Sequence, residues 1–431
     1  MTTHSSRNTN YDTIIIGGGT AGVVAAIQAG RAGAKALLVE KSGMLGGTVT
    51  VGGVNYPGLF FAWKKQVVAG IGWELVQRCL QETGQRVPEP VHDFEKTHGS
   101  YHIPVDRFIF AALCDEAVEA AGVEMLFHTM IAGLAPGAGG GWEVTLCTKT
   151  GLTTRTASVI IDATGDANAT ALAGFPLSIP DENQPATLCC HAGGYDTSAL
   201  DIDAINRAFD AEVRAGRLHY TDASWNTKGP DVGRWLIKAG ENATHTHHIN
   251  ARDSEGKTQL EIEARKGLLR FYRFLRRQPK LEKLCIVHMA PECGVRETAT
   301  IQGKRTVTVD DYVSGRVWDD AVCYSFYMID LHVSSGNGIE GRGLAEGVVP
   351  TIPRGAMLPA GSRNFIVAGR CISSDRLANS ALRVQASCMA IGQAAGALAA
   401  LAVQHQIDPE EVAIDELHHL LRRHQAITPK L

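Results

Sequence analysis

One turn near the N-terminus constrains the fold more than any other part of the sequence. It reads Gly17-Gly18-Gly19-Thr20-Ala21-Gly22 and matches the pattern G-x-G-x-x-G. The first glycine permits a tight turn, the second lets the backbone approach a pyrophosphate, and the third lets a helix pack on a strand. A β-branched run at 12–16 precedes the turn, and a helical stretch at 20–31 follows it. The next apolar run ends at Glu40, whose carboxylate can accept both ribose hydroxyls, so we expect a dinucleotide-binding β-α-β unit.

Two further strand ends decide between NAD and FAD, since the turn alone could bind either. A second glycine-rich loop at 41–48 follows Glu40 and would let the backbone reach further along a long cofactor. Far downstream, one apolar run ends in Asp162-Ala163-Thr164-Gly165-Asp166, and another ends in Gly369-Arg370. Three strand ends that are distant in sequence would then converge on one ligand, which favours FAD.

These residues resemble the FAD-dependent oxidoreductase family of the glutathione-reductase-like flavoprotein clan, in its fumarate-reductase-like branch. The stretch at 375–382 is similar to the R-L-x-x-N-S-L segment of fumarate reductases. The resemblance implies FAD, and a helix beginning near Ser380 would direct its dipole at the reduced flavin. The cofactor-binding residues that it implies are Gly17, Gly19, Gly22, Glu40, Lys41, Gly46, Gly47, Thr48, Ala163, Thr164, Gly165, Gly369, Arg370, Ser380 and Leu382.

The sequence differs from two subclasses of this family, in how FAD is attached and in the absence of cysteine clusters. Succinate dehydrogenases attach FAD through a His that precedes a Thr-Val pair, and Gly47 occupies that position here. The resemblance therefore implies noncovalent FAD. The ten cysteines are scattered without a C-x-x-C pair, which excludes iron–sulfur clusters and zinc knuckles, so we expect no metal.

The predicted fold class is α/β. We expect a discontinuous Rossmann-like FAD-binding domain with a β-meander, formed by residues 1–184 and 351–431. A mixed α+β capping domain, which would carry the substrate site, is expected as an insertion at 185–350, where glycine motifs thin out and aromatics and histidines gather.

Four residues are predicted to be catalytic. In the segment 244–250, which contains three histidines, a metal site, an exposed loop and an active-site base all stay open, and His248 is taken as the base. Arg296, in a G-V-R-E-T stretch resembling one in the family, could bind a carboxylate or support the flavin, or it could pair with Glu297 or another nearby acid. His332 lies in a segment resembling the family's P-I-D-I-H run. Arg376 matches the arginine that meets the substrate carboxylate in fumarate reductases, although the surrounding His-Gly run is missing.

The expected function is that of an FAD-dependent dehydrogenase or oxidase that transfers hydride between a small molecule and flavin N5. Only one dinucleotide fingerprint is present, which favours electrons that come from the substrate itself. One alternative is an FAD monooxygenase that uses NAD(P)H and O2. Asp166, directly after the Ala163-Thr164-Gly165 turn, leaves this alternative open. The other is a noncatalytic flavin subunit that transfers electrons within a larger complex.

Composition limits the partners and the compartment. Lysine and arginine total 41 against 45 acidic residues, so neither nucleic acid nor an anionic membrane surface is an expected partner. The apolar segment at 384–403 contains two glutamines and is predicted to be a buried core helix. Residues 1–10 are polar and lack the apolar region of a signal peptide, and the cysteines are expected to be free thiols, so we expect the cytoplasm. The oligomeric state stays open, a homo-oligomer included.

Overall fold

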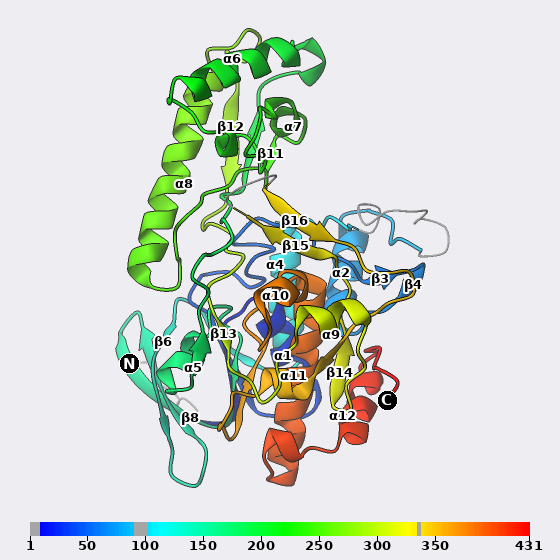
Figure 1. Ribbon diagram of the computed structural model, residues 1–431. Helices are drawn as coiled ribbons and strands as arrows, with labels where there is room; N and C mark the ends of the chain where they lie inside the picture. The colour runs from blue at the N-terminus through cyan, green and yellow to red at the C-terminus, as the bar shows by residue number, and fades with distance from the viewer. Residues whose placement is uncertain (1–8, 90–101, 334–337) are drawn as a thin grey trace.

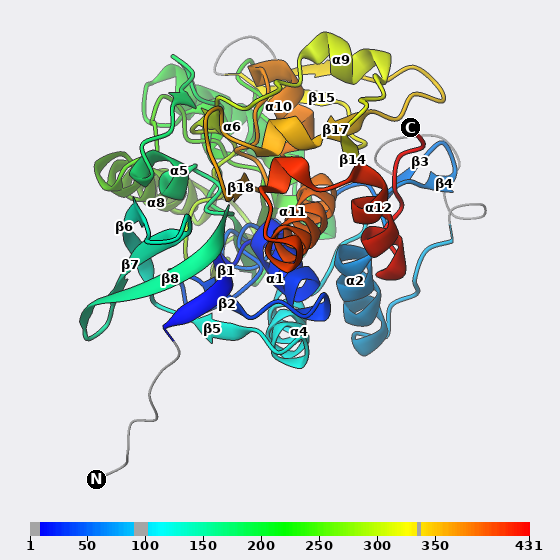
Figure 2. The same ribbon diagram turned by 90° about the horizontal axis from the view of Figure 1, so that it is seen from below.

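A seven-stranded sheet forms the centre of the protein, for which a computed structural model describes residues 9–89, 102–333 and 338–431. Its strand order is β5-β2-β1-β8-β7-β6, with β18 beside β8 (Figure 2). The strands are β1 (Asn10–Ile16), β2 (Ala36–Val39), β5 (Glu124–Leu126), β6 (Met130–Pro136), β7 (Trp142–Thr148), β8 (Gly151–Asp162) and β18 (Phe365–Val367). Strands β5, β2, β1, β8 and β18 run parallel, whereas β6 and β7 form an antiparallel meander with β8. The predicted α/β class, with a Rossmann-like sheet and a β-meander, is confirmed.

Helices pack on one side of this sheet (Figure 2). They are α1 (Thr20–Arg31), α2 (Ile71–Glu82), α4 (Arg107–Ala120), α11 (Gln385–His405) and α12 (Ile414–Arg423). Among the described residues, α11 is the one helix that is long and apolar enough to cross a membrane, but 89% of its most apolar window is buried inside the protein. It is therefore a core helix of this fold, as the sequence predicted.

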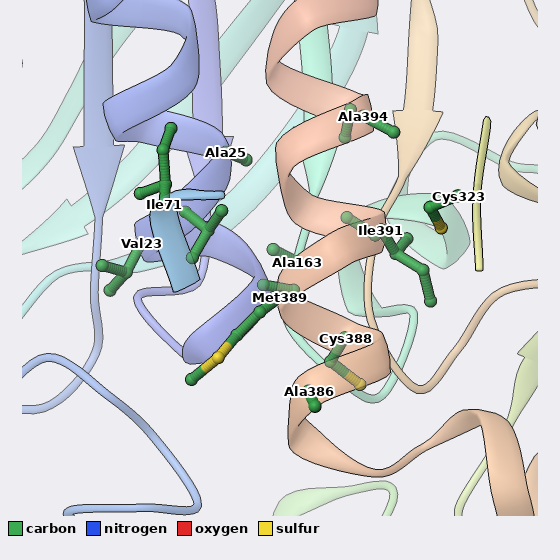
Figure 3. Close-up of a cluster of buried hydrophobic side chains, with 14 of the residues drawn as sticks. Val23, Ala25, Ile71, Ala163, Cys323, Ala386, Cys388, Met389, Ile391 and Ala394 are labelled. Atoms are coloured by element: carbon green, nitrogen blue, oxygen red, sulfur yellow. The ribbon is translucent and has the colours of Figure 1, made fainter. Parts of the chain in front are cut away.

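Glycines let the backbones of α1 and α11 touch. A Cβ atom at Gly392 would lie 2.1 Å from the carbonyl oxygen of Ala21, and one at Gly396 would lie 2.2 Å from that of Ala25. The small side chain of Ala25 on α1 lies on the side of that helix that faces α11, as Figure 3 shows. This close packing fixes the start of α1, which carries the dinucleotide turn, against the C-terminal part of the chain.

The helix expected to begin near Ser380 is in fact two helices. Helix α10 (Arg376–Leu382) ends at Arg383, Val384 is extended with a ψ angle of 148°, and α11 starts at Gln385. No glycine or proline marks this break, which is why the sequence pattern did not reveal it. The break turns Arg383 toward the cavity described below, and it moves the helix start five residues beyond Ser380.

A second unit carries its own hydrophobic core and forms the upper lobe in Figure 1. A three-stranded sheet is formed by β10 (Cys190–Gly193), β11 (Gly240–Glu241) and β12 (Cys285–Met289). Three helices accompany it, namely α6 (Ile202–Arg214), α7 (Val232–Ile237) and α8 (Ser254–Leu275). Phe209, Trp235 and Phe271 are buried together between these elements.

The remaining elements pack mostly with the first unit. They are β3 (Phe61–Ala62) with β4 (Lys65–Gln66), β9 (Leu177–Ser178) with β13 (Thr300–Ile301), β14 (Ala321–Tyr324) with β17 (Thr351–Pro353), β15 (Ile329–His332) with β16 (Ile339–Arg342), α5 (Asn168–Leu172) and α9 (Val309–Ser314). Tyr312, Phe326 and Leu344 belong to the main hydrophobic core. We therefore propose that the capping unit comprises about 186–295, shorter than the expected 185–350. Residues 1–8, 90–101 and 334–337 of the expected domains lie outside the described residues.

An ion pair with a buried carboxylate is expected to stabilise the capping unit. Asp222 is 5% exposed at its side chain and accepts two hydrogen bonds from Arg270 on α8, at 2.8 and 2.7 Å. Asp222→Ala removes these two charge-assisted hydrogen bonds, while Arg270, which is 34% exposed, stays solvated, so the free energy of unfolding should fall by about 2 kcal/mol. Glu263→Ala, which removes an exposed pair with Lys266, should cost under about 0.5 kcal/mol. Denaturant unfolding of both variants checks this, and equal losses would contradict the role given to Asp222.

Candidate active site

One cavity of about 1010 Å³ lies where the dinucleotide turn meets the capping unit. Its lining includes Gly17 and Gly19 from the turn, and Trp225 and Arg234 from the capping unit. Ligand pockets of about 300–1,000 Å³ hold drug-sized molecules. The volume is therefore sufficient for a ligand larger than a simple metabolite.

The turn is shaped to receive an anion at the start of α1. Gly17 has a φ angle of +105°, and a Cβ at Gly22 would lie 1.8 Å from the carbonyl oxygen of Gly17, so both positions require glycine. A Cβ at Gly19 would meet no protein atom within 4 Å and would occupy the cavity instead. No side chain caps α1, and its first turn carries no acidic residue. Free N–H groups and the helix dipole thus favour a phosphate at this point.

Glu40 is held in a fixed orientation at the edge of the same cavity. Its Oε2 atom accepts a hydrogen bond from the backbone N–H of Gly18 at 2.6 Å, and its Oε1 atom accepts one from the N–H of Ser42 at 2.7 Å. The side chain is buried but lines the cavity. A carboxylate has about four lone-pair positions, so it can still accept hydrogen bonds from a ribose. These contacts fit the adenosine end of FAD.

The structure brings most of the predicted cofactor residues to the cavity. The residues that line it are Gly17, Gly19, Glu40, Lys41, Gly47, Thr48, Ala163, Thr164, Gly165, Gly369 and Arg370. Gly22, Gly46, Ser380 and Leu382 do not line it. Gly22 packs against the backbone of Gly17 within the turn. Ser380 accepts a hydrogen bond from the N–H of Asp330, and Leu382 is buried in the core. Val384, Gln385 and Cys388 line the cavity at the place where Ser380 was expected.

Asp330 and His332 form a polar pair on strand β15 and line the opposite part of the cavity. They are two residues apart on a strand, so their side chains share one face. Nε2 of His332 lies 3.3 Å from Oδ2 of Asp330, and Nδ1 lies 3.1 Å from Nε2 of His245. Burial and the nearby Arg296 lower the pKa of His332 to about 4. Burial opposes ionisation of Asp330, but His332 and two arginines lower its pKa to about 2.

Two arginines add positive charge next to this pair. Arg296 donates hydrogen bonds to the carbonyl oxygen of Pro185 at 2.7 Å and to Oγ1 of Thr187 at 2.9 Å. Arg383 donates to the carbonyl oxygen of Asp330 at 3.1 Å, and its guanidinium lies 3.8 Å from the carboxylate of that residue. Burial, followed by repulsion from Arg383, lowers the pKa of Arg296 to about 10. Both cations line the cavity, and a bound anion would relieve their mutual repulsion.

The other two predicted catalytic residues lie away from this centre. His248 is exposed and does not line the cavity, because the extended segment before it ends there with a φ angle of +59°. Arg376 also lies outside the lining and pairs with Glu297 at 3.2 Å. Arg296 and His332 alone among the four line the cavity. Within the described residues, no group of three or more His, Cys, Asp or Glu side chains could hold a metal ion.

Sequence reasoning did not select Asp330, His245 or Arg383. The pattern Asp-x-His at 330–332 was a usable signal, since alternate residues of a strand share a face. His245 lies within the three-histidine segment, but its contact with His332 joins positions 87 residues apart. Arg383 is directed by the break between α10 and α11, which has no sequence marker.

Because His332 is buried and neutral, acid should destabilise the folded protein through it. The pKa of His332 is about 4 in the folded state, below the value of 6.5 for an unperturbed histidine. Between pH 7 and pH 5 the unfolded chain therefore binds more protons, and His332 alone should lower the free energy of unfolding by about 2 kcal/mol. Asp330, with a pKa of about 2, does not titrate in this window. Denaturant unfolding at both pH values should show a smaller loss in His332→Gln, and identical losses would contradict this account.

The Rossmann-like sheet and the glycine-rich turn at the cavity fit a dinucleotide cofactor. The family model described as FAD dependent oxidoreductase matches residues 12–421. The chain belongs to this family, and it is an FAD-dependent enzyme. No curated protein sequence matches it significantly.

The solved structures that match this chain do so with low sequence identity and low TM-scores. OxyS anhydrotetracycline hydroxylase from Streptomyces rimosus has a TM-score of 0.30 and 16% identity, over 42% of this chain and 37% of that chain. A geranylgeranyl bacteriochlorophyll reductase-like protein from Thermoplasma acidophilum has a TM-score of 0.44 and 13% identity, over 96% and 82% of the two chains. The p-nitrophenol 4-monooxygenase PnpA from Pseudomonas putida DLL-E4 has a TM-score of 0.42 and 10% identity, over 97% of this chain and 85% of that chain. The chain thus spans less than two thirds of the first of these proteins.

Proposed function

We propose that the protein oxidises a small anionic molecule in the cavity between the dinucleotide turn and the capping unit, with FAD as the electron acceptor. One observation carries this proposal. Arg296, Arg383 and the Asp330–His332 pair line the same cavity as Gly17 and Gly19. When bound, FAD supplies a group that accepts a hydride at N5. The residues of the chain then bind the substrate, orient it and accept the proton that it loses.

FAD would be held by backbone groups and by a few polar side chains. The start of α1 would bind the pyrophosphate, and Glu40 the ribose. We propose noncovalent binding, because Gly47 offers no nucleophile at the position where a histidine attaches FAD in succinate dehydrogenases. Its φ angle of +51°, and a distance of 2.8 Å from a Cβ there to Cα of Gly19, exclude a side chain at this position. Acid precipitation should therefore release all the flavin into the supernatant.

Asp330 and His332 would act as the base. Both ring nitrogens of His332 are engaged, Nε2 with Asp330 at 3.3 Å and Nδ1 with His245 at 3.1 Å. The carboxylate of Asp330 would therefore take the substrate's proton and pass it to Nε2 of His332, which is neutral at pH 7. The negative charge of Asp330 also stabilises the protonated ring that forms. A carboxylate of the substrate would lie between the guanidinium groups of Arg296 and Arg383, which bind planar anions well.

A screen with matched acids and amides tests this proposal. FAD-loaded protein would be mixed without oxygen with small hydroxy and amino acids and with the amide of each, while the visible flavin absorbance is followed. We expect at least one acid to bleach the flavin, its amide to do so much more slowly, and Arg296→Gln to remove the difference. Bleaching by neutral molecules alone, or equal rates for acid and amide, would contradict the anionic substrate.

The proposal extends to the compartment and the partners of the protein. All ten cysteines are free thiols, which fits a reducing compartment, and we propose the cytoplasm. The partner that we propose is the small-molecule substrate, rather than nucleic acid or a membrane. Sedimentation of the FAD-loaded protein would measure whether it forms a homo-oligomer.

A further inference from the structure

Four histidines lie in a row from the cavity to the surface of the protein. The ring centroids of His332 and His245 are 4.9 Å apart, those of His245 and His247 are 5.5 Å apart, and those of His247 and His248 are 5.9 Å apart. His332 is 4% exposed and His245 is 5% exposed, whereas His247 is half-buried and His248 is exposed. The row therefore connects a cavity-lining histidine with solvent.

Backbone pairing keeps the outer histidines in register. The N–H of Thr246 donates to the carbonyl oxygen of Ala186 at 2.8 Å, and the N–H of Ala186 donates back at 3.0 Å. This pairing holds the segment in an extended conformation, so His245 and His247 point to the same side. The N–H of His245 is also bound to the carbonyl oxygen of Thr221. The positions of the rings are thus set by the fold.

The inner contact already has the form of a proton-transfer step. Nδ1 of His332 and Nε2 of His245 are 3.1 Å apart, so one nitrogen donates and the other accepts. Nδ1 of His245 is buried and has no hydrogen-bond partner among the described residues. The nearest outer ring is that of His247, whose centroid is 5.5 Å from that of His245, so we assign the following transfer to this pair. A buried ring nitrogen without a hydrogen-bond partner lowers the stability of the fold, so a functional role is a reason for its presence.

We propose that His245, His247 and His248 form a proton relay that carries the proton released in the cavity from His332 to solvent. This inference rests on the proposed function, in which substrate oxidation leaves a proton at the Asp330–His332 pair. Each histidine accepts a proton at one ring nitrogen and releases another from the opposite nitrogen. One proton enters at His332 and one leaves at His248, so no net charge stays in the row. The three relay histidines act through His332 and do not touch the substrate.

The surrounding charges disfavour a proton that stays on His245 or His247. Arg296, Arg383 and His332 face His245, and burial together with these groups lowers its pKa well below 6.5. Burial and then His248 and Arg296 lower the pKa of His247 to about 4, against a small opposing effect from Glu182. A proton on either inner ring is therefore short-lived and moves outward to His248, which is solvated.

Exchange of ring protons with water tests the relay without any substrate. FAD-loaded protein labelled with 15N at histidine would be studied by NMR, with signals assigned through His245→Gln and His332→Gln. In the wild type we expect rapid exchange of the ring N–H protons of His245 and His332. The variant His247→Gln should slow this exchange by about tenfold or more, and added imidazole should restore it.

The control is His191→Gln, which changes an exposed histidine on β10 of the same unit and should leave the exchange rates unchanged. Unaltered exchange in His247→Gln, or slow exchange in the wild type, would overturn the relay. Either result would leave the proposed oxidation untouched, since the screen of acids tests that separately. A failure of the screen alone would in turn leave the relay standing as a proton path to the cavity.

Discussion

Replacing Gly19 with alanine is expected to remove most FAD binding while leaving the folded protein as stable as the wild type. The new Cβ would meet no protein atom within 4 Å, and the backbone at Gly19 has a φ angle of −69°, which alanine adopts without strain. The methyl group would instead occupy the part of the cavity where the pyrophosphate approaches α1. We expect the dissociation constant of FAD to rise by about 100-fold, which corresponds to about 2.7 kcal/mol.

Two glycines provide the controls for this prediction. Gly343→Ala also meets no atom within 4 Å, but Gly343 is exposed and outside the cavity, so FAD affinity should be unchanged. Gly22→Ala brings a Cβ to 1.8 Å from a carbonyl oxygen and should reduce stability as well as affinity. Flavin fluorescence titration and thermal unfolding of the apoprotein measure the two quantities. Wild-type affinity in Gly19→Ala would contradict the placement of FAD at this turn.

His332→Gln is expected to slow flavin reduction by the substrate at least about 100-fold, the usual range for loss of a general base. Glutamine keeps a polar group of similar size, but it cannot take up a proton. FAD affinity should stay the same, since His332 lies on β15, apart from the dinucleotide turn. Stopped-flow absorbance, with the acid identified by the screen, measures the rate.

The matched control is His191→Gln, which removes an exposed histidine outside the cavity and should leave the rate unchanged. The pH dependence adds a second readout. Flavin reduction in the wild type should fall as the pH approaches 4, where His332 becomes protonated, and this fall should be absent from the residual rate of His332→Gln. A variant as fast as the wild type would exclude His332 as the base.

The dinucleotide-binding part could be predicted because its signals are local. The turn at 17–22, the adjoining strands and Glu40 lie within about one β-α-β unit, and the geometry of that unit fixes what each glycine must do. The structure has β1 and α1 within two residues of the predicted bounds. Local sequence also predicted that α11 is buried, because its glutamines and glycines suit a core helix.

The substrate side could not be predicted to the same depth because its contacts join distant parts of the chain. His332 meets His245 across 87 positions, and Arg383 is aimed by a helix break that has no glycine or proline. The sequence predicted His248 as the base and not His245, since neither spacing nor residue type distinguishes three neighbouring histidines. The pairing of Thr246 with Ala186, together with the bond from the N–H of His245 to Thr221, holds His245 toward the interior. Side chains that are positioned by tertiary contacts leave little trace in a single sequence.

The most direct test of the account is the visible absorbance of the FAD-loaded protein, without oxygen, after addition of NADH or NADPH and, separately, of the panel of small acids. The account holds that FAD and an anionic substrate share one cavity and that the substrate supplies the electrons. It predicts that the yellow colour persists with either pyridine nucleotide and is bleached by an acid. Rapid bleaching by NADH or NADPH, with no acid effective, would contradict it and would favour the monooxygenase alternative.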